Sequence, residues 1–319
     1  IFFLKRCSST IKTYNLTQVS AFHLLGFSED PDLQPILFGL FLSMYLVTVL
    51  GNLLIIVAIS TESHLHIPMY FFLSNLSFVD ICFISTMVPK MIVDIVSHNR
   101  AISYVGCLTQ MSVFLIFASI DHMLLTIMAY DRFVAICHPL HYTIIMNPHR
   151  CVLLLLMAIP VSLVESQLHS VVILQFTCFK DVKIANFFCD PSQLLSLSCS
   201  GPLIKTIVTC IVVIIFGLFP ISGLFFSYCK IVSSILKIPP SGGRHKAFST
   251  CGSHMSAVCL FYGTGIGVYL SSAVSQSPRK CMVASLMYTV VTPMLNPFIC
   301  SLQNRDMSSA LKRLHGRTV

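Results

Sequence analysis

The chain contains no tryptophan and few charges: only 10% of its 319 residues are Asp, Glu, Lys or Arg. Roughly a quarter of the residues of a soluble domain are charged, so this scarcity excludes a soluble globular protein. Acidic residues are scarcer than basic ones, with 12 against 20, and the formal net charge is +8. The basic residues are scattered over short connectors, which excludes a nucleic-acid-binding protein. Hydrophobic residues make up 55% of the chain and the mean hydropathy is +0.83. We therefore expect most of the folded protein to be surrounded by lipid.

The sequence also lacks the signatures of catalysis and transport. It contains no recognisable nucleophile elbow, metal-ligand cluster or phosphate-cradling glycine loop. We therefore do not expect an enzyme. It has no internal repeat with the symmetry of a transporter, and its connectors are too short for a second domain.

Seven segments are apolar and long enough to span a bilayer, for which a helix needs about 20 residues. They cover residues 33–59, 67–91, 101–128, 151–174, 203–235, 247–273 and 281–302. The sequence therefore predicts an all-α membrane protein, a seven-transmembrane helix bundle, with an N-terminal segment at 1–32, the bundle at 33–303 and a tail at 304–319. Within the tail, residues 305–317 are basic and partly amphipathic, which predicts a short helix on the membrane surface; a disordered basic tail is the alternative.

The basic residues do not determine the orientation of the bundle. With the termini on opposite sides, ten Lys and Arg fall on each side, so the positive charge typical of cytoplasmic connectors gives no preference. Asn15 begins an Asn-Leu-Thr glycosylation acceptor, which only lumenal enzymes can modify. We therefore expect a multi-pass plasma-membrane protein with an extracellular N-terminus, glycosylated at Asn15, and a cytoplasmic C-terminus. No signal-peptide pattern precedes the first span, so we expect that span to direct insertion.

Residues 128–142 read MAYDRFVAICHPLHY and place an acid and a base at the end of a long apolar helix. Burying either charge in lipid is costly, so we expect Asp131 and Arg132 where the helix leaves the membrane. Pro139 follows closely, and proline disfavours helical geometry in the residue before it.

This run resembles the signature of olfactory receptors, which belong to the rhodopsin-like seven-helix family. Further motifs carry the resemblance: Gly51-Asn52, Pro68 to Ser77 (PMYFFLSNLS), Ser227-Tyr228, Lys246 to Cys251 (KAFSTC), Ser253-His254, Phe261 to Thr264 (FYGT) and Pro293 to Phe298 (PMLNPF). It covers nearly the whole chain from about Phe22 onward, and the short polar linker is similar to that of the tetrapod-type class. The absence of tryptophan agrees, because most other rhodopsin-like receptors have tryptophan where this chain has Phe-Tyr-Gly.

The resemblance implies an odorant receptor. Such a protein would bind a small volatile odorant within the helix bundle and activate a stimulatory heterotrimeric G protein of the olfactory type, which raises cyclic AMP. Membrane lipid and trafficking chaperones are the other partners that it implies. Two other interpretations remain: a receptor-derived membrane protein with weak or no signalling, and a channel or transporter that uses Asp80 and Asp121 as an ion path.

Four cysteines are expected in the oxidising compartment. Cys107 opens the third span, and Cys178, Cys189 and Cys199 lie in the long connector after the fourth. They allow three pairings. The resemblance implies one bridge between Cys107 and Cys189 and another between Cys178 and Cys199, with free thiols as the alternative. Each bridge would restrict the connector over the mouth of the ligand site.

Asp80 and Asp121 lie near the centres of the second and third spans, where a lone ionised carboxylate is costly. If the two meet, either they share a proton or a cation such as sodium lies between them with help from Asn52 and Asn296. The resemblance supports the cation-linked centre. The alternative is a satisfied hydrogen-bond knot that holds the bundle together. We expect no cofactor other than this sodium ion.

The ligand site is expected in the outer half of the bundle. Along the third span, apolar residues recur at helical spacing, which by itself indicates core more often than a pocket. The resemblance assigns a mostly apolar lining to Phe114, Leu115, Ala118, Ser119, Val212, Val213, Phe216, Gly265, Ile266, Tyr269, Ser285 and Thr289. No Lys or Arg clearly faces this lining, so we expect a neutral ligand. Glu165, in the fourth span, is expected to face water; an amine site is the alternative.

The resemblance also implies an activation switch near the cytoplasmic ends of the helices. Its members are Asp131, Arg132, Phe133, Tyr228, His254, Tyr262, Asn296, Pro297 and Cys300. Arg132 would pair with Asp131 at rest and release it when the sixth span swings out to admit a G-protein helix; an ion pair that only anchors the helix end is the alternative. Cys300 stands where the family normally has Tyr, and Gln303 replaces an Arg, so we expect weaker coupling.

Overall fold

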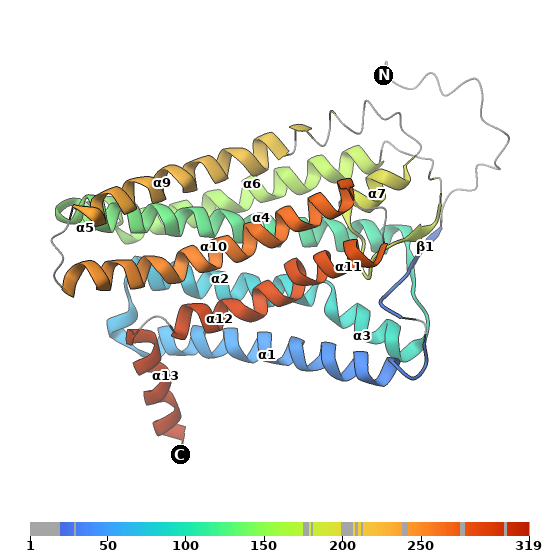
Figure 1. Cartoon of the computed structure of the whole chain (residues 1–319), viewed down its shortest axis with the longest axis horizontal. Coiled ribbons are helices and arrows are strands. Elements are labelled where there is room, and N and C mark those ends of the chain that lie inside the picture. Colours follow the sequence, from blue (N-terminus) through green and yellow to red (C-terminus); the bar gives the residue numbers. More distant parts are fainter. Residues whose placement is uncertain are drawn as a thin grey trace.

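The structure is a computed structural model that describes residues 20–28, 30–174, 179, 181–198, 207, 210–211, 213–237, 242–274, 278–302 and 305–318. These residues form a seven-helix bundle (Figure 1). Its spans are α1 (Gln34–Thr61), α2 (Pro68–Ser85) continued by α3 (Val88–Ser97), α4 (Tyr104–Cys137), α6 (Pro148–Leu174), η3 (Val213–Leu218) continued by α9 (Phe219–Leu236), α10 (Gly242–Val274), and α11 (Pro278–Leu286) continued by η4 (Met287–Val291) and α12 (Thr292–Leu302). In the part described, six spans are long and apolar enough to cross a membrane, and α10 contains a shorter apolar stretch, His254–Val268.

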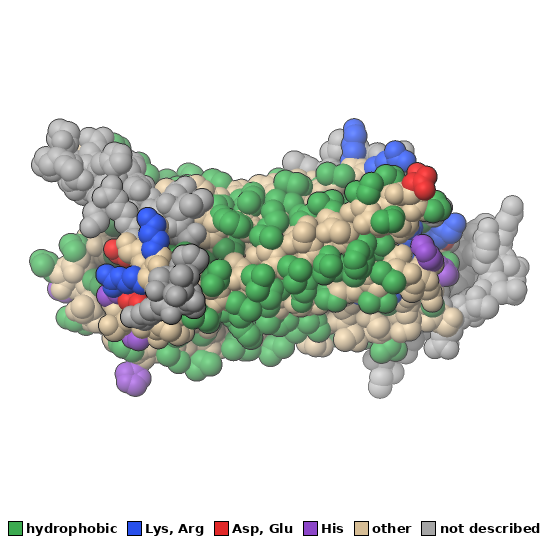
Figure 2. All heavy atoms as spheres, turned by 90° about the horizontal axis from the view of Figure 1, so that it is seen from below, with side chains coloured by type: hydrophobic (Ala, Val, Ile, Leu, Met, Phe, Trp, Pro, Cys, Tyr) green, Lys and Arg blue, Asp and Glu red, His purple; other side chains and the backbone are tan. Residues whose placement is uncertain are grey.

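The surface of the bundle carries apolar side chains that a soluble protein would bury. Figure 2 shows hydrophobic side chains across the middle of the face in view, with Lys, Arg, Asp and Glu toward its two ends. Leu50, Leu54 and Phe226 are each more than half exposed. Such exposure is unfavourable in water, whereas lipid tails are as apolar as leucine. The chain is therefore a multi-pass membrane protein, as its composition predicts.

The third span differs from its predicted bounds at both ends. Residues Ala101–Ser103, expected to open the helix, form the strand β2 instead, and α4 begins at Tyr104. The helix starts there because the Ser103 hydroxyl accepts a hydrogen bond from the backbone N–H of Gly106 at 3.1 Å, which caps the first turn. At its other end, α4 continues past the predicted residue 128 to Cys137 and stops just before Pro139.

The second span is longer than predicted and is divided into two helices. It reaches Ser97 rather than Met91, with a break at Thr86 and Met87 between α2 and α3. Pro89 causes the break, because its ring lacks an N–H and clashes with the backbone carbonyl four residues earlier.

A small β-sheet covers one end of the bundle, which we call the β-sheet end (Figure 1). Its central strand is β1 (Ala21–Leu24), which pairs antiparallel with β2 and parallel with β3 (Lys183–Ile184). The N-terminal segment therefore joins two connectors that are far from it in sequence.

The opposite end carries α13 (Arg305–Thr318), and we call it the α13 end. The predicted helix of the tail is confirmed. Met307 and Ala310 are fully buried against the main core, and Arg313 forms an ion pair of 3.4 Å with Glu62, just after α1. Packing of its apolar residues fixes this helix to the bundle, since its intrinsic length alone would make it marginal in water.

Candidate functional site

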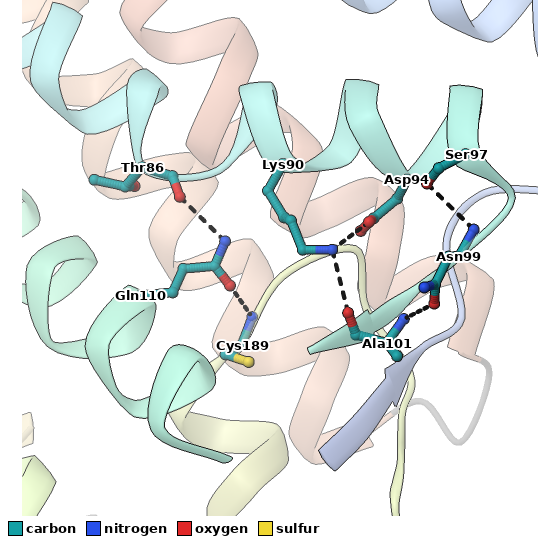
Figure 3. Close-up of polar contacts among 8 residues, drawn as sticks. All are labelled: Thr86, Lys90, Asp94, Ser97, Asn99, Ala101, Gln110 and Cys189. Atoms are coloured by element: carbon teal, nitrogen blue, oxygen red, sulfur yellow. Dashed lines mark hydrogen bonds and ion pairs between the residues drawn. The ribbon is translucent and has the colours of Figure 1, made fainter. Parts of the chain in front are cut away.

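The predicted disulfide between Cys107 and Cys189 is present, with sulfur atoms 2.05 Å apart. It joins the start of α4 to the connector that contains β3 and α7 (Pro191–Leu197). Beside it, the Gln110 amide accepts a hydrogen bond from the Cys189 backbone N–H and donates one to the Thr86 carbonyl, both at 3.1 Å (Figure 3). That carbonyl lies at the break between α2 and α3. One side chain therefore links the break, the third span and the disulfide.

Lys90 links α3 to the β-sheet. Its ammonium group pairs with Asp94 on the next turn of α3 and donates to the Ala101 carbonyl of β2 at 3.3 Å (Figure 3). The Lys90 ammonium group is thus held by two acceptors, and β2 is fixed to α3.

Residues 20–28, which we call the strap, close the β-sheet end. Phe22 is fully buried and packs edge to face on Phe179, with ring centroids 5.2 Å apart. The Arg100 guanidinium donates to the carbonyl of Leu25 at 2.5 Å and to that of Ser28. The packing of Phe22 and the hydrogen bonds from Arg100 together hold the strap across the end of the bundle.

A continuous series of aromatic rings connects the strap to the interior. The rings, each in contact with the next, are Phe27, Phe187, Phe188, Phe114, Phe83, Tyr288, Phe261 and Tyr262. Successive ring centroids lie 5.1–5.9 Å apart, the range of favourable aromatic pairs. The series passes through Phe114, a predicted lining residue, and ends at Tyr262, a predicted switch residue.

The connector after the fourth span reaches the seventh through a second polar contact. Asn186 donates to the hydroxyl of Ser285 at 3.0 Å and to Asp190 at 3.4 Å. Asp190 caps α7, accepting from the backbone N–H of Ser192 at 2.7 Å. Burial raises the pKa of Asp190 above its usual range, although its hydrogen bonds oppose the shift. Ser285 is thus occupied by a protein partner in this arrangement.

The other predicted lining residues divide into three groups. Leu115 and Ala118 pack against a core cluster with Phe114, Thr289 is fully buried, and Gly265 lies close to Tyr288. Phe216 is partly buried, whereas Ile266 is 51% exposed and therefore lies on the surface of the bundle, which corrects its predicted place in the lining. Val212 and the side chains of Val213 and Tyr269 lie outside the described residues.

Glu165 lies inside the bundle, and the expectation that it faces water is wrong. Only 9% of the residue is exposed, and its carboxylate accepts a hydrogen bond of 2.6 Å from Ser119 on α4. The neighbouring Ser166 and Ser170 also bond to α4, at the Ser112 carbonyl and hydroxyl. Close packing of α6 on α4 through these small residues takes Glu165 away from solvent.

The two central acids are buried, with Asp80 fully inaccessible and Asp121 1% exposed. Asn296 donates to both carboxylate oxygens of Asp80, at 3.1 and 3.0 Å. Both oxygens of Asp121 and the side-chain carbonyl oxygens of Asn52 and Asn296 are buried without a hydrogen-bond partner among the described residues. Oxygen atoms are the ligands that hard cations prefer, so this residue set fits a sodium ion.

Several predicted switch residues meet near the α13 end. The Tyr228 hydroxyl and the His254 ring form a hydrogen bond, and their rings stack with centroids 5.8 Å apart, which joins α9 to α10. Pro297 packs against Gly51, where an added Cβ would lie 3.4 Å from the proline ring. Glycine therefore permits the close approach of α1 and α12. The side chain of Cys300 lies outside the described ones.

The acid and base at the end of α4 do not form the predicted ion pair with each other. Asp131 is buried and accepts a hydrogen bond of 2.9 Å from the Tyr142 hydroxyl in α5 (Tyr142–Ile145), and no Asp131–Arg132 ion pair occurs among the ion pairs of the described residues. Adjacent residues of a helix point in different directions. Arg132 lies within electrostatic range of both Asp131 and His254 on α10. Phe133 packs on His138 beyond the helix end.

Sequence reasoning missed the residues that hold the β-sheet end together, namely Gln110, Arg100, Asn186 and the strap. A polar amide one turn after Cys107 in an apolar helix is the signal that would have drawn attention to Gln110. The predictions for Asn15, Cys178, Cys199 and Gln303 lie outside the described residues.

Comparisons with known proteins give a consistent result. The sequence model of the family described as olfactory receptor matches residues 41–317. The chain is 68% identical to human olfactory receptor 7E24 over 318 residues, covering 100% of this chain and 94% of that protein. It is 66% identical to mouse olfactory receptor 7E178, covering 98% and 95%, and 58% identical to human olfactory receptor 7D4, covering 95% and 97%.

Proposed function

This chain belongs to the olfactory receptor family of G-protein-coupled receptors, and we propose that it binds a small volatile odorant inside the bundle and activates a stimulatory G protein. The β-sheet end would face the exterior and the α13 end the cytosol. The aromatic series from Phe27 to Tyr262 carries the proposal, because it connects the end that an odorant reaches with the helices that a G protein would engage.

The ligand site that we propose lies beside Phe114, where the series passes between α2 and α4. Its neighbours Leu115 and Ala118 are apolar, which suits a volatile molecule. Among the described residues predicted to line the site, none is Lys or Arg. We therefore propose a neutral ligand, since an anion would be buried without a cationic partner.

Signal transfer would use the contacts near the α13 end. Because Tyr228 and His254 hold α9 to α10, an outward movement of α10 must break or redirect this pair. Arg132 lies within electrostatic range of His254 and would then be free to contact a G-protein helix. We also propose that Asp80, Asp121, Asn52 and Asn296 hold a sodium ion in the resting receptor, where its single positive charge would balance one buried carboxylate while the other carboxyl group stays protonated.

Expression of the tagged receptor with a cyclic-AMP reporter tests the proposal. Cells that display it are exposed to a panel of volatile compounds, and Arg132→Ala at equal surface expression is the control. We expect a ligand-evoked rise in cyclic AMP that the variant loses. Ligand binding without nucleotide exchange would favour a receptor-derived protein that no longer signals. The presence of Cys300 where the family normally has Tyr supports that alternative. Accessibility of both termini from the same side of the membrane would refute the proposed topology.

A further inference from the structure

We propose that Glu165 determines the chemical class of the ligand, and that this ligand carries a hydrogen-bond donor such as a hydroxyl or amine group. The inference rests on the proposed odorant-binding function and makes it more specific. An ionisable residue inside a membrane protein usually has a functional partner, because its burial is costly. Glu165 is 9% exposed, and Ser119 supplies its hydrogen bond, at 2.6 Å.

The partner of Glu165 places the carboxylate beside the proposed ligand site. Ser119 is on α4, four residues after Leu115, so the two share a face of the helix, and Leu115 packs against the same cluster as Phe114. One hydroxyl donates one hydrogen, whereas the two oxygens of a carboxyl group can together accept more than one hydrogen bond. The carboxylate therefore retains acceptor capacity that Ser119 does not fill.

A second buried acceptor lies on the same helix. His122 follows Ser119 by three residues, so the two share a face of α4. It is 7% exposed, and its Nε2 has no hydrogen-bond partner among the described residues. The ring interacts with the Ala118 backbone carbonyl, which requires an N–H on Nδ1 and leaves Nε2 as an acceptor.

The balance of donors and acceptors then defines the ligand. On this part of α4 and α6, the Glu165 carboxylate and the His122 Nε2 both accept, while Ser119 provides a single donor. The unpaired His122 Nε2 and the remaining acceptor capacity of Glu165 favour a molecule that brings an O–H or N–H group. A ketone, ester or ether would add a further acceptor and leave the imbalance in place.

The test compares matched volatile compounds on the full-length receptor in the cyclic-AMP assay. The probes are 1-hexanol, 1-hexylamine and hexyl methyl ether, together with cyclohexanol and methoxycyclohexane. We expect the donor compounds to activate at concentrations lower than the ethers by roughly tenfold to hundredfold, the range for a hydrogen bond to a charged group. Equal potency of an alcohol and its ether at the unmodified receptor would overturn the proposal, and this comparison needs no variant.

Variants identify the residue responsible for the donor advantage, by which we mean the lower concentration at which a donor compound activates the receptor compared with its matched ether. Glu165→Gln should remove most of the donor advantage, because the amide has fewer acceptor sites than the carboxylate and brings an NH₂ donor of its own. Ser170→Ala is the matched control, because it removes another hydrogen bond between α6 and α4, to Ser112 at 2.8 Å, and should keep the donor advantage. If Glu165→Gln fails to reach the surface, Ser119→Ala replaces it: the carboxylate stays and the donor advantage should persist or grow. Loss of the donor advantage in Ser119→Ala would contradict the role of Glu165. An equal shift in the potency of all compounds in Glu165→Gln would contradict it as well.

The same assay separates the two proposals. Responses confined to the ethers would overturn the role of Glu165 and leave the odorant-receptor function intact. Silence toward these probes and toward the wider volatile panel would overturn both. A preference for the amine over the alcohol would support the donor requirement and correct the expected neutrality of the ligand.

Discussion

Replacement of Phe22 by Ala should detach the strap from the rest of the protein. The Phe22 ring is fully buried in a cluster that also contains the Cys107–Cys189 bridge, and it packs on Phe179 at 5.2 Å. Truncation of a buried phenylalanine to alanine costs about 3–5 kcal/mol, because it removes the transfer free energy of the ring and leaves a cavity.

The size of this loss can be compared with the other contacts of the strap. The backbone N–H groups of His23, Leu24 and Leu25 donate to neighbouring connectors at 2.9, 3.0 and 3.0 Å. Three such hydrogen bonds stabilise the strap by about 1.5–4.5 kcal/mol in total. The ring thus contributes as much as the three backbone bonds together. Since each 1.4 kcal/mol is about a factor of ten in an equilibrium constant, the open form of the strap should become at least about 100-fold more populated.

Hydrogen–deuterium exchange on the receptor in lipid nanodiscs measures this change directly. Peptides that contain residues 20–28 should exchange at least about 100-fold faster in Phe22→Ala, while peptides from α4 keep their protection. His23→Ala is the matched control, because the His23 side chain is exposed and its backbone hydrogen bond remains. An acceleration of less than about tenfold in Phe22→Ala would refute the conclusion that the ring holds the strap in place.

Three further predictions concern other parts of the molecule. Leu140, in η2 (Pro139–His141), is 90% exposed beside the switch, so Leu140→Asp should abolish the cyclic-AMP response at equal surface expression while Leu140→Met retains it. Asp190→Ala removes the cap of α7 and should lower stability by about 1 kcal/mol. Because the pKa of Asp190 is raised in the folded protein, folding is favoured at acid pH, and stability should fall as pH rises from the ordinary aspartate value through the raised one. Thermal unfolding of Asp190→Asn should not show this dependence. Replacing sodium by choline should change ligand potency in the unmodified receptor and leave it unchanged in Asp121→Asn; a sodium effect that survives in the variant would count against the proposed site.

The long spans were predictable because hydrophobicity in a membrane protein is a strong and extended signal. All seven predicted segments contain helices of the described chain, and the main errors concern ends and breaks. Residues 101–103 were predicted to open the third span. In the structure they form β2, since pairing with β1 satisfies backbone groups that lie outside the helix. Tertiary contacts of this kind leave no periodic pattern in a strand of three residues.

The candidate site was predicted less completely, for a different physical reason. The Cys107–Cys189 bridge followed from family motifs and is confirmed. Glu165 was misplaced because helical spacing alone does not say which neighbour covers a residue. Its burial depends on the approach of α6 to α4 through Ser166 and Ser170, which only the three-dimensional arrangement reveals.

The helix α4 connects most of the features on which the proposed signal depends. It packs against α2, α6 and α9 and also touches α10, and its polar residues bond to different neighbours: Ser119 to α6 and Asp131 to α5. Hydrogen bonds of 2.6 and 2.9 Å weaken strongly when their atoms separate by even half an ångström. A ligand that donates to the Glu165 carboxylate beside Ser119 would therefore act on the contact that joins α6 to the helix that carries Arg132. A small shift of α4 is then enough to couple the identity of the ligand to the state of the switch, without any large movement of the β-sheet end.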